Sequence, residues 1–181
     1  MRAARTYARR GPASAEFLAW LDAVEAECET ISGRTREALR LIGHAEDIIA
    51  AGSPHTSPDW FTWFSPARLA AFKGNTQLKA GHLPQAKETL LGALADPSIA
   101  GNRSVILGDL AAVEAAQHSP EAACAYAGQA LEQLGTSWYA TGMDRVLEVR
   151  KALQPDAELD CVQQLDDRLY GWQATLSTLQ R

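Results

Sequence analysis

The side chains most often used in catalysis are present in this sequence, but they are spread out and form no known motif. The four histidines are His44, His55, His82 and His118. His82 and His118 occupy equivalent turns between expected helices, where we expect a polar ring to face solvent rather than act as a base or ligand. The sequence contains no GxxxxGK phosphate-binding loop, GxGxxG dinucleotide turn or GxSxG nucleophile elbow. We therefore predict no catalytic residue, no cofactor and no enzyme activity.

The sequence also lacks the residue spacing that a metal site or a disulfide framework requires. The three cysteines are Cys28, Cys124 and Cys161. They form no CxxC pair and no Cys/His ligand pattern, so neighbours in the sequence cannot build a zinc module or a disulfide framework. We expect a reducing, cytoplasmic location. Glu25, Glu27 and Glu29 do not share one helix face, and we interpret them as solvated surface rather than as a metal site.

Large aromatic side chains gather in one short stretch. Trp60, Phe61, Trp63 and Phe64 fall within five residues, and side chains so close along a helix cannot all point the same way. Trp60, Trp63 and Phe64 could form a hot-spot rim for a protein partner. They could instead fill a gap between helices, which is the interpretation that we favour. Trp172, in the last expected helix, is a further candidate interface residue.

Composition and charge narrow the possible functions. The 181 residues are 46% hydrophobic and 22% charged, which suits one globular domain with a substantial core. A formal net charge of -5 provides no basic field, so direct binding to nucleic acid is not expected. No stretch is apolar enough to suggest a membrane span. Arginines within residues 1–13 suggest a basic flexible arm or linker remnant.

Apolar residues recur at three- and four-residue steps along most of the chain, while valine and isoleucine are sparse. This pattern predicts an all-α fold, a superhelix of helical hairpins with about eight helices. Ser65 followed by Pro66 marks a helix start, and Gly81 marks a helix end. The expected hairpins cover residues 14–52, 66–96, 104–135 and 138–179, with an insertion at 53–65. Residues 14–181 would then form a single domain.

Three of the hairpins share one spacing of small and apolar residues around their turns. The turn residues are Gly33, Gly81 and His118. A small residue follows five positions later, an apolar residue nine positions later, and another small residue twelve positions later. Small side chains are needed where two helices cross closely. The spacing therefore indicates an internal repeat.

This spacing resembles the tetratricopeptide repeat, a helix pair that stacks into a right-handed superhelix. The stretches Trp63–Ala70, Arg103–Leu107 and Tyr139–Gly142 are similar to the C-terminal repeat region of actinobacterial transcriptional regulators that carry an N-terminal helix-turn-helix. The resemblance runs from about residue 15 to residue 170. It implies a sensory or oligomerisation region whose ligand is a short peptide or a protein segment. No helix-turn-helix precedes residue 15, so DNA binding is not implied.

The resemblance also implies a concave groove lined by the first helix of each hairpin. By the repeat template, its lining includes Arg68, Phe72, Asn75 and Lys79 in the second hairpin and Asp109 in the third. Asn75 could pair with a peptide backbone. Arg68 and Lys79 could bind a carboxylate through charge-assisted hydrogen bonds. Alternatively, the polar residues of this set only solubilise a helix face.

These observations favour binding over catalysis. We expect a non-catalytic protein- or peptide-binding regulatory module, the sensory or interaction part of a transcriptional regulator, with no metal or cofactor. One alternative is a constitutive assembly module in which the last helix or the aromatic insertion forms a homodimer and no small ligand exists. A second alternative is an enzyme of unrecognised type, which would need a polar pocket with a converging acid, base or nucleophile.

Overall fold

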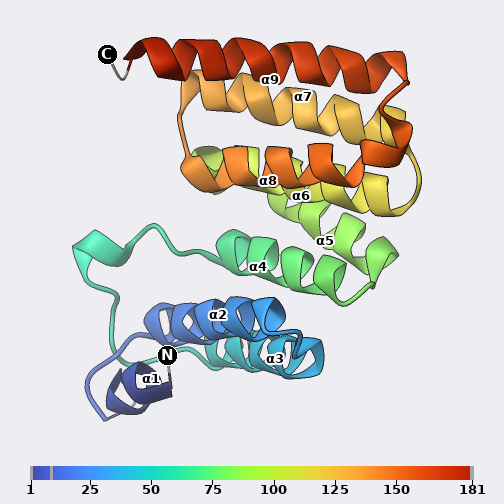
Figure 1. The fold of residues 1–181 in the computed structure, drawn as a ribbon. Coiled ribbons are helices and arrows are strands. Elements are labelled where there is room, and N and C mark those ends of the chain that lie inside the picture. The colour runs from blue at the N-terminus through green and yellow to red at the C-terminus, as the bar shows by residue number, and fades with distance from the viewer. Residues whose placement is uncertain (1, 9, 180–181) are drawn as a thin grey trace. The chain divides into compact units, whose positions relative to one another are not determined.

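The computed structural model describes residues 2–8 and 10–179 and is built from helices (Figure 1). The described residues contain no β-strand, which confirms the all-α prediction. The α-helices are α1 (Arg2–Ala8), α2 (Ala15–Ile31), α3 (Thr35–Ala51), α4 (Pro66–Lys79), α5 (Leu83–Ala95), α6 (Arg103–Ala116), α7 (Pro120–Thr136), α8 (Ala140–Ala152) and α9 (Asp160–Leu179). Short 3-10 helices lie between them at η1 (Asp59–Phe61), η2 (Pro97–Asn102) and η3 (Gln154–Asp156). Among the described helices, none has the length and apolar character needed to cross a membrane.

The helices are grouped in two compact units, Met1–Ile99 with α1 to α5 and Ala100–Arg181 with α6 to α9. The repeat pattern predicts a single domain over residues 14–181. In the first unit the hairpins α2–α3 and α4–α5 pack on each other, and in the second unit the hairpins α6–α7 and α8–α9 do so. The ends of these hairpins lie close to the expected ones.

The turns of three hairpins have the same backbone geometry. Gly33, Gly81 and His118 have positive φ angles of 75°, 79° and 57°. In each turn, the N–H of this residue donates to the carbonyl three positions earlier, at 3.0 to 3.1 Å. The next N–H donates to the carbonyl five positions before it, at 2.9 to 3.0 Å. Such paired bonds close a helix around a left-handed residue, so all three turns share the predicted register.

Small residues lie where packed helices come closest, both within a hairpin and between neighbouring hairpins. The alanines five positions after each turn are completely buried. They are Ala38, Ala86 and Ala123. A Cβ atom at Gly74 of α4 would lie 2.5 Å from the Cγ atom of Leu90 in α5, and one at Gly108 of α6 would lie 2.6 Å from the Cβ atom of Arg145 in α8. These close crossings explain the repeated small residues and agree with the predicted helical-repeat fold.

Residues 2–8 form a helix within the segment 1–13, for which the sequence predicts a basic flexible arm or linker remnant. Helix α1, Arg2–Ala8, packs against α2 in the first unit. Its residues are mainly alanine and arginine, which have high helix propensity. Met1 and Arg9 of the expected arm, and Gln180 and Arg181 of the expected domain, lie outside the described residues.

Candidate functional site

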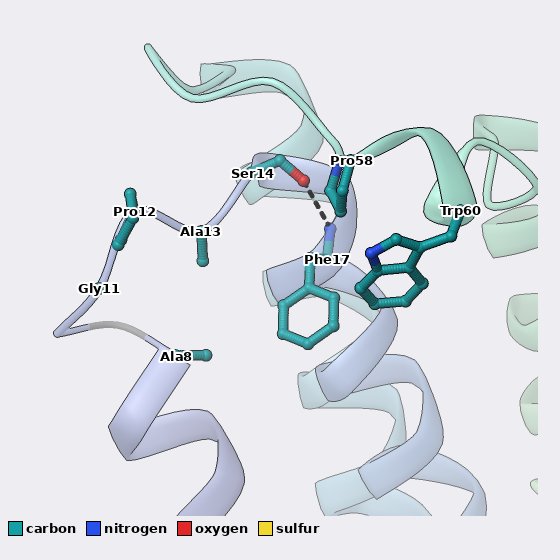
Figure 2. Close-up of a pocket in the computed structure, with 8 residues that line it drawn as sticks. All are labelled: Ala8, Gly11, Pro12, Ala13, Ser14, Phe17, Pro58 and Trp60. Atoms are coloured by element: carbon teal, nitrogen blue, oxygen red, sulfur yellow. Dashed lines mark hydrogen bonds between the residues drawn. The ribbon is translucent and has the colours of Figure 1, made fainter.

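The first unit contains an apolar pocket between its N-terminal segment and the insertion, with a volume of about 270 Å³. Its lining consists of Ala8, Gly11, Pro12, Ala13, Ser14, Phe17, Pro58 and Trp60. In Figure 2, Ala8 and Ala13 approach the Phe17 ring from one side, and Pro58 and the Trp60 indole lie on the other. The pocket therefore presents rings and methyl groups, which suit an apolar ligand group.

Two hydroxyl groups hold the insertion against the start of α2. Ser14 is the N-cap residue of α2, and its Oγ accepts a hydrogen bond from the Phe17 N–H at 3.2 Å. The Ser57 hydroxyl lies 2.7 Å from Ser14 Oγ and donates to Glu16 Oε2 at 2.9 Å. The two hydroxyls and the carboxylate therefore form one hydrogen-bonded group. The Ser14 hydroxyl is thus engaged within the protein, although it lines the pocket.

Glu16 is the charged group at the end of this hydrogen-bond chain. Its own backbone N–H and the hydroxyls of Ser57 and Ser14 lower the pKa of the Glu16 carboxyl, against the opposing effect of burial. Its place in the first turn of α2 also favours a negative charge, because the helix N-terminus is partially positive. Ionised Glu16 therefore stabilises the link between α2 and the insertion.

Beside the pocket, aromatic residues pack around Phe61 of η1. Phe61 is buried, and its ring centroid lies 5.2 Å from that of Phe17 and 5.5 Å from that of Trp20. Trp60 and Trp63 flank it at 5.6 and 5.0 Å. These two tryptophans nevertheless remain 70% and 46% exposed. The insertion thus fills space beside α2 and also presents two indoles at the surface.

The structure corrects the role of Phe64 as an interface residue and places Trp172 in an aromatic pair. Phe64 is only 3% exposed and belongs to the core of the first unit, where its ring stacks on Phe61 with centroids 6.2 Å apart. In the second unit, Trp172 is half-buried because its ring packs on Trp138 at 5.7 Å. Trp138 is the more exposed member of that pair.

The four ligand-binding candidates of α4 differ in accessibility. The Arg68 Cζ atom lies 5.3 Å from the centroid of the Trp63 ring, which is a cation–π contact. Phe72 is partly buried against the core, Asn75 is buried, and Lys79 is exposed. Helix α4 packs against α2, α3 and α5, which leaves little of its surface open. The predicted pairing of Asn75 with a peptide backbone is therefore wrong. Its side chain is enclosed and cannot reach a bound peptide.

Asp109, the candidate from the third hairpin, is an ion-pair residue of the second unit. Its side chain is 2% exposed, and its Oδ1 atom lies 3.2 Å from the Nε atom of Arg145. Arg145 also pairs with Glu148 at 3.4 Å. Because α6 packs against α8, the Asp109 carboxylate is enclosed between these helices rather than open to a ligand. Its predicted place in a groove lining is therefore wrong.

Acidic residues of α2 are buried rather than solvated as expected. Glu25 and Glu29 are buried, and Glu29 pairs with Arg34 at the start of α3. Asp22 is completely buried and pairs with His44 of α3. These pairs contribute to the packing of α2 on α3. Within the described ranges, no three His, Cys, Asp or Glu side chains are placed to hold a metal ion.

Sequence reasoning identified only one residue of the pocket lining, Trp60, as a candidate. The other walls come from the segment before α2 and from Pro58, so no periodic pattern connects them. Pro12 and Pro58, together with the N-cap residue Ser14, are the signals that could have indicated two fixed turns beside a helix start.

The chain was compared with models of protein families, with curated proteins and with solved structures. None of the three comparisons found a match. The geometry of the pocket and of the exposed tryptophans is therefore the basis for a functional proposal.

Proposed function

We propose that this chain is a protein- or peptide-binding module whose first unit holds an apolar side chain of its partner in the pocket beside Trp60. The observation that carries the proposal is the apolar pocket lining together with the 70% exposure of Trp60 at its edge. The pocket volume of about 270 Å³ lies just below the ~300–1,000 Å³ usual for pockets that bind drug-sized ligands. A pocket of this size suits one or two side chains. The Trp60 indole N–H can donate to a backbone carbonyl of the bound segment.

We further propose that binding serves a regulatory role. The proposal is supported by the resemblance of the repeats to those of actinobacterial transcriptional regulators, in which such a region would report a bound peptide or protein segment. In this chain the bound segment would contact the insertion and the start of α2, rather than Asn75 or Asp109, because those two side chains are enclosed.

Peptide selection tests the site. A displayed random-peptide library is selected on the wild-type chain, and the enriched peptides are titrated against Trp60→Ala and Trp138→Ala by fluorescence polarisation. Truncating a hot-spot tryptophan costs about 2 kcal/mol or more, so we expect Trp60→Ala to bind at least about 30-fold more weakly. Trp138→Ala removes an exposed tryptophan of the second unit and should bind like the wild type. Peptides that bind Trp60→Ala and wild type equally would exclude this pocket as the site.

Exposed aromatic residues of the second unit favour a second candidate function, self-association. Trp138, Tyr139 and Tyr170 are all exposed. Large exposed rings are enriched in protein interfaces. Light scattering distinguishes the candidates: a wild-type dimer that becomes a monomer in Tyr170→Ala supports assembly, whereas a monomer at high concentration argues against it.

A further inference from the structure

Two cysteines that are far apart in the sequence meet in the second unit. Cys124 lies near the start of α7, and Cys161 lies at the start of α9. Both line a pocket of about 300 Å³ beside these two packed helices. The two thiols are close enough for Cys161 to contribute to the pKa of Cys124. The third cysteine, Cys28, is exposed on α2 of the first unit and offers an internal control.

The two thiols have different surroundings. Cys124 is 9% exposed, whereas Cys161 is only half-buried. Burial, together with the hydrogen bond to Cys161, raises the pKa of the Cys124 thiol to about 12. Cys124 therefore keeps its proton at neutral pH and can donate it to the Cys161 sulfur. Cys161 is the more accessible of the two sulfurs, so it is the one that a dissolved oxidant reaches first.

Further contacts hold the two helices side by side beyond the cysteines. Arg168 of α9 donates through Nη2 to the carbonyl oxygen of Gly128 in α7 at 2.9 Å, and lies 3.3 Å from Glu132 Oε1. Near the end of α7, a Cβ atom at Gly135 would lie 3.7 Å from the Trp172 side chain of α9. Because these contacts follow one another along both helices, the folded chain keeps the two thiols together.

We propose that Cys124 and Cys161 form a reversible dithiol–disulfide site that responds to hydrogen peroxide. The Cys161 thiolate attacks one peroxide oxygen, the O–O bond breaks, and hydroxide leaves, which produces a sulfenic acid on Cys161. The Cys124 sulfur then attacks the Cys161 sulfur, the S–O bond breaks, and the departing hydroxide takes the Cys124 proton. The two thiols lose two electrons in total, and one peroxide molecule becomes two water molecules. A reducing thiol reverses the bond.

This bond would link α7 covalently to α9 and so join the last hairpin to the one before it. The site is open to the oxidant because the pocket beside the thiols is much larger than a peroxide molecule. It is independent of the peptide-binding function proposed for the first unit, so either can fail without the other.

Thiol mapping on the full chain tests the proposal. The reduced chain is treated with equimolar hydrogen peroxide, alkylated with iodoacetamide, and analysed by intact mass and peptide mapping. We expect alkylation of Cys28 alone, a mass lower by two hydrogen atoms before alkylation, and linked peptides that contain Cys124 and Cys161. Cys28→Ser should form the same bond, and dithiothreitol should open it. Alkylation of all three cysteines, or bonds that include Cys28, would overturn the proposal.

Two variants test the order of attack. In Cys124→Ser, the sulfenic acid has no partner, so dimedone should label Cys161. In Cys161→Ser, the buried Cys124 thiol should stay reduced and unlabelled. Strong dimedone labelling of Cys124 in Cys161→Ser would overturn the assigned order. The wild-type mapping does not depend on how well either variant folds.

Discussion

A short chain of hydrogen bonds decides where Trp60 lies. Ser57 is followed by Pro58, whose ring fixes the backbone, and then by η1, which carries Trp60. Because Ser57 is bonded to both Ser14 and Glu16, the residues after it are held beside the start of α2. At the scale of single residues, the shape of the pocket therefore depends on polar side chains, although its lining is almost wholly apolar.

Replacing Ser57 by alanine should destabilise the chain more at neutral pH than in acid. The hydroxyl helps to lower the pKa of Glu16 in the folded state. Its stabilising effect is therefore complete above the ordinary Glu16 value of 4.5 and is lost as the pH falls through the folded value. The bond is partly exposed, so we expect a loss toward the lower end of about 0.5–1.5 kcal/mol at pH 7. Urea unfolding followed by circular dichroism at pH 7 and pH 3 measures this difference.

Ser53→Ala is the matched control for that experiment. The Ser53 hydroxyl donates to the neutral carbonyl of Ala13 at 3.3 Å, so no carboxylate titrates against it. Its loss should change the free energy of unfolding by a similar amount at both pH values. A pH-independent effect of Ser57→Ala would contradict the role given to Glu16.

At the scale of elements, the hairpins could be predicted because their signals are local. A left-handed turn residue and small residues at fixed offsets lie within one hairpin, and Gly81 and Ala86 occupy their predicted places. The partners of Asp109 and Cys124 could not be predicted, because each lies in a helix of the following hairpin. The spacing of apolar residues within one hairpin does not predict which of its faces packs against the next hairpin. The same limit explains why Asp109 was assigned to an open groove.

Two glycines in neighbouring helices should respond oppositely to alanine. A Cβ atom at Gly74 would lie 2.5 Å from the Cγ atom of the buried Leu90 side chain, whereas a Cβ atom at Gly92 meets nothing within 4 Å. Gly74→Ala should therefore destabilise the chain by roughly 1–3 kcal/mol, less the gain in helix propensity. Gly92→Ala should stabilise it by up to about 1 kcal/mol. Thermal and urea unfolding measure both changes. If the two substitutions change the free energy of unfolding in the same direction, the close crossing of α4 and α5 is contradicted.

At the scale of the whole molecule, the sequence indicated one continuous array, whereas the helices form two compact units. Repeats suggest continuity because each hairpin resembles the next in pattern. The boundary falls inside η2, a 3-10 segment that contains Pro97 and Gly101 and interrupts the series of hairpins. Each unit has its own completely buried side chains, such as Leu41 and Phe61 in the first and Leu110 and Val146 in the second.

Separate expression of residues 1–99 and 100–181 tests this division together with the proposed function. Each fragment has a core of its own, so each should be helical by circular dichroism and unfold in a cooperative transition. Fragments of this size bury a smaller share of their surface than a longer chain does. We therefore expect each fragment to unfold at a low midpoint temperature. The 1–99 fragment contains the whole Trp60 pocket and should bind peptides selected on the full chain with unchanged affinity. If the 1–99 fragment folds but no longer binds these peptides, the peptide site needs residues beyond position 99. If either fragment lacks a cooperative transition, the two units depend on each other to fold.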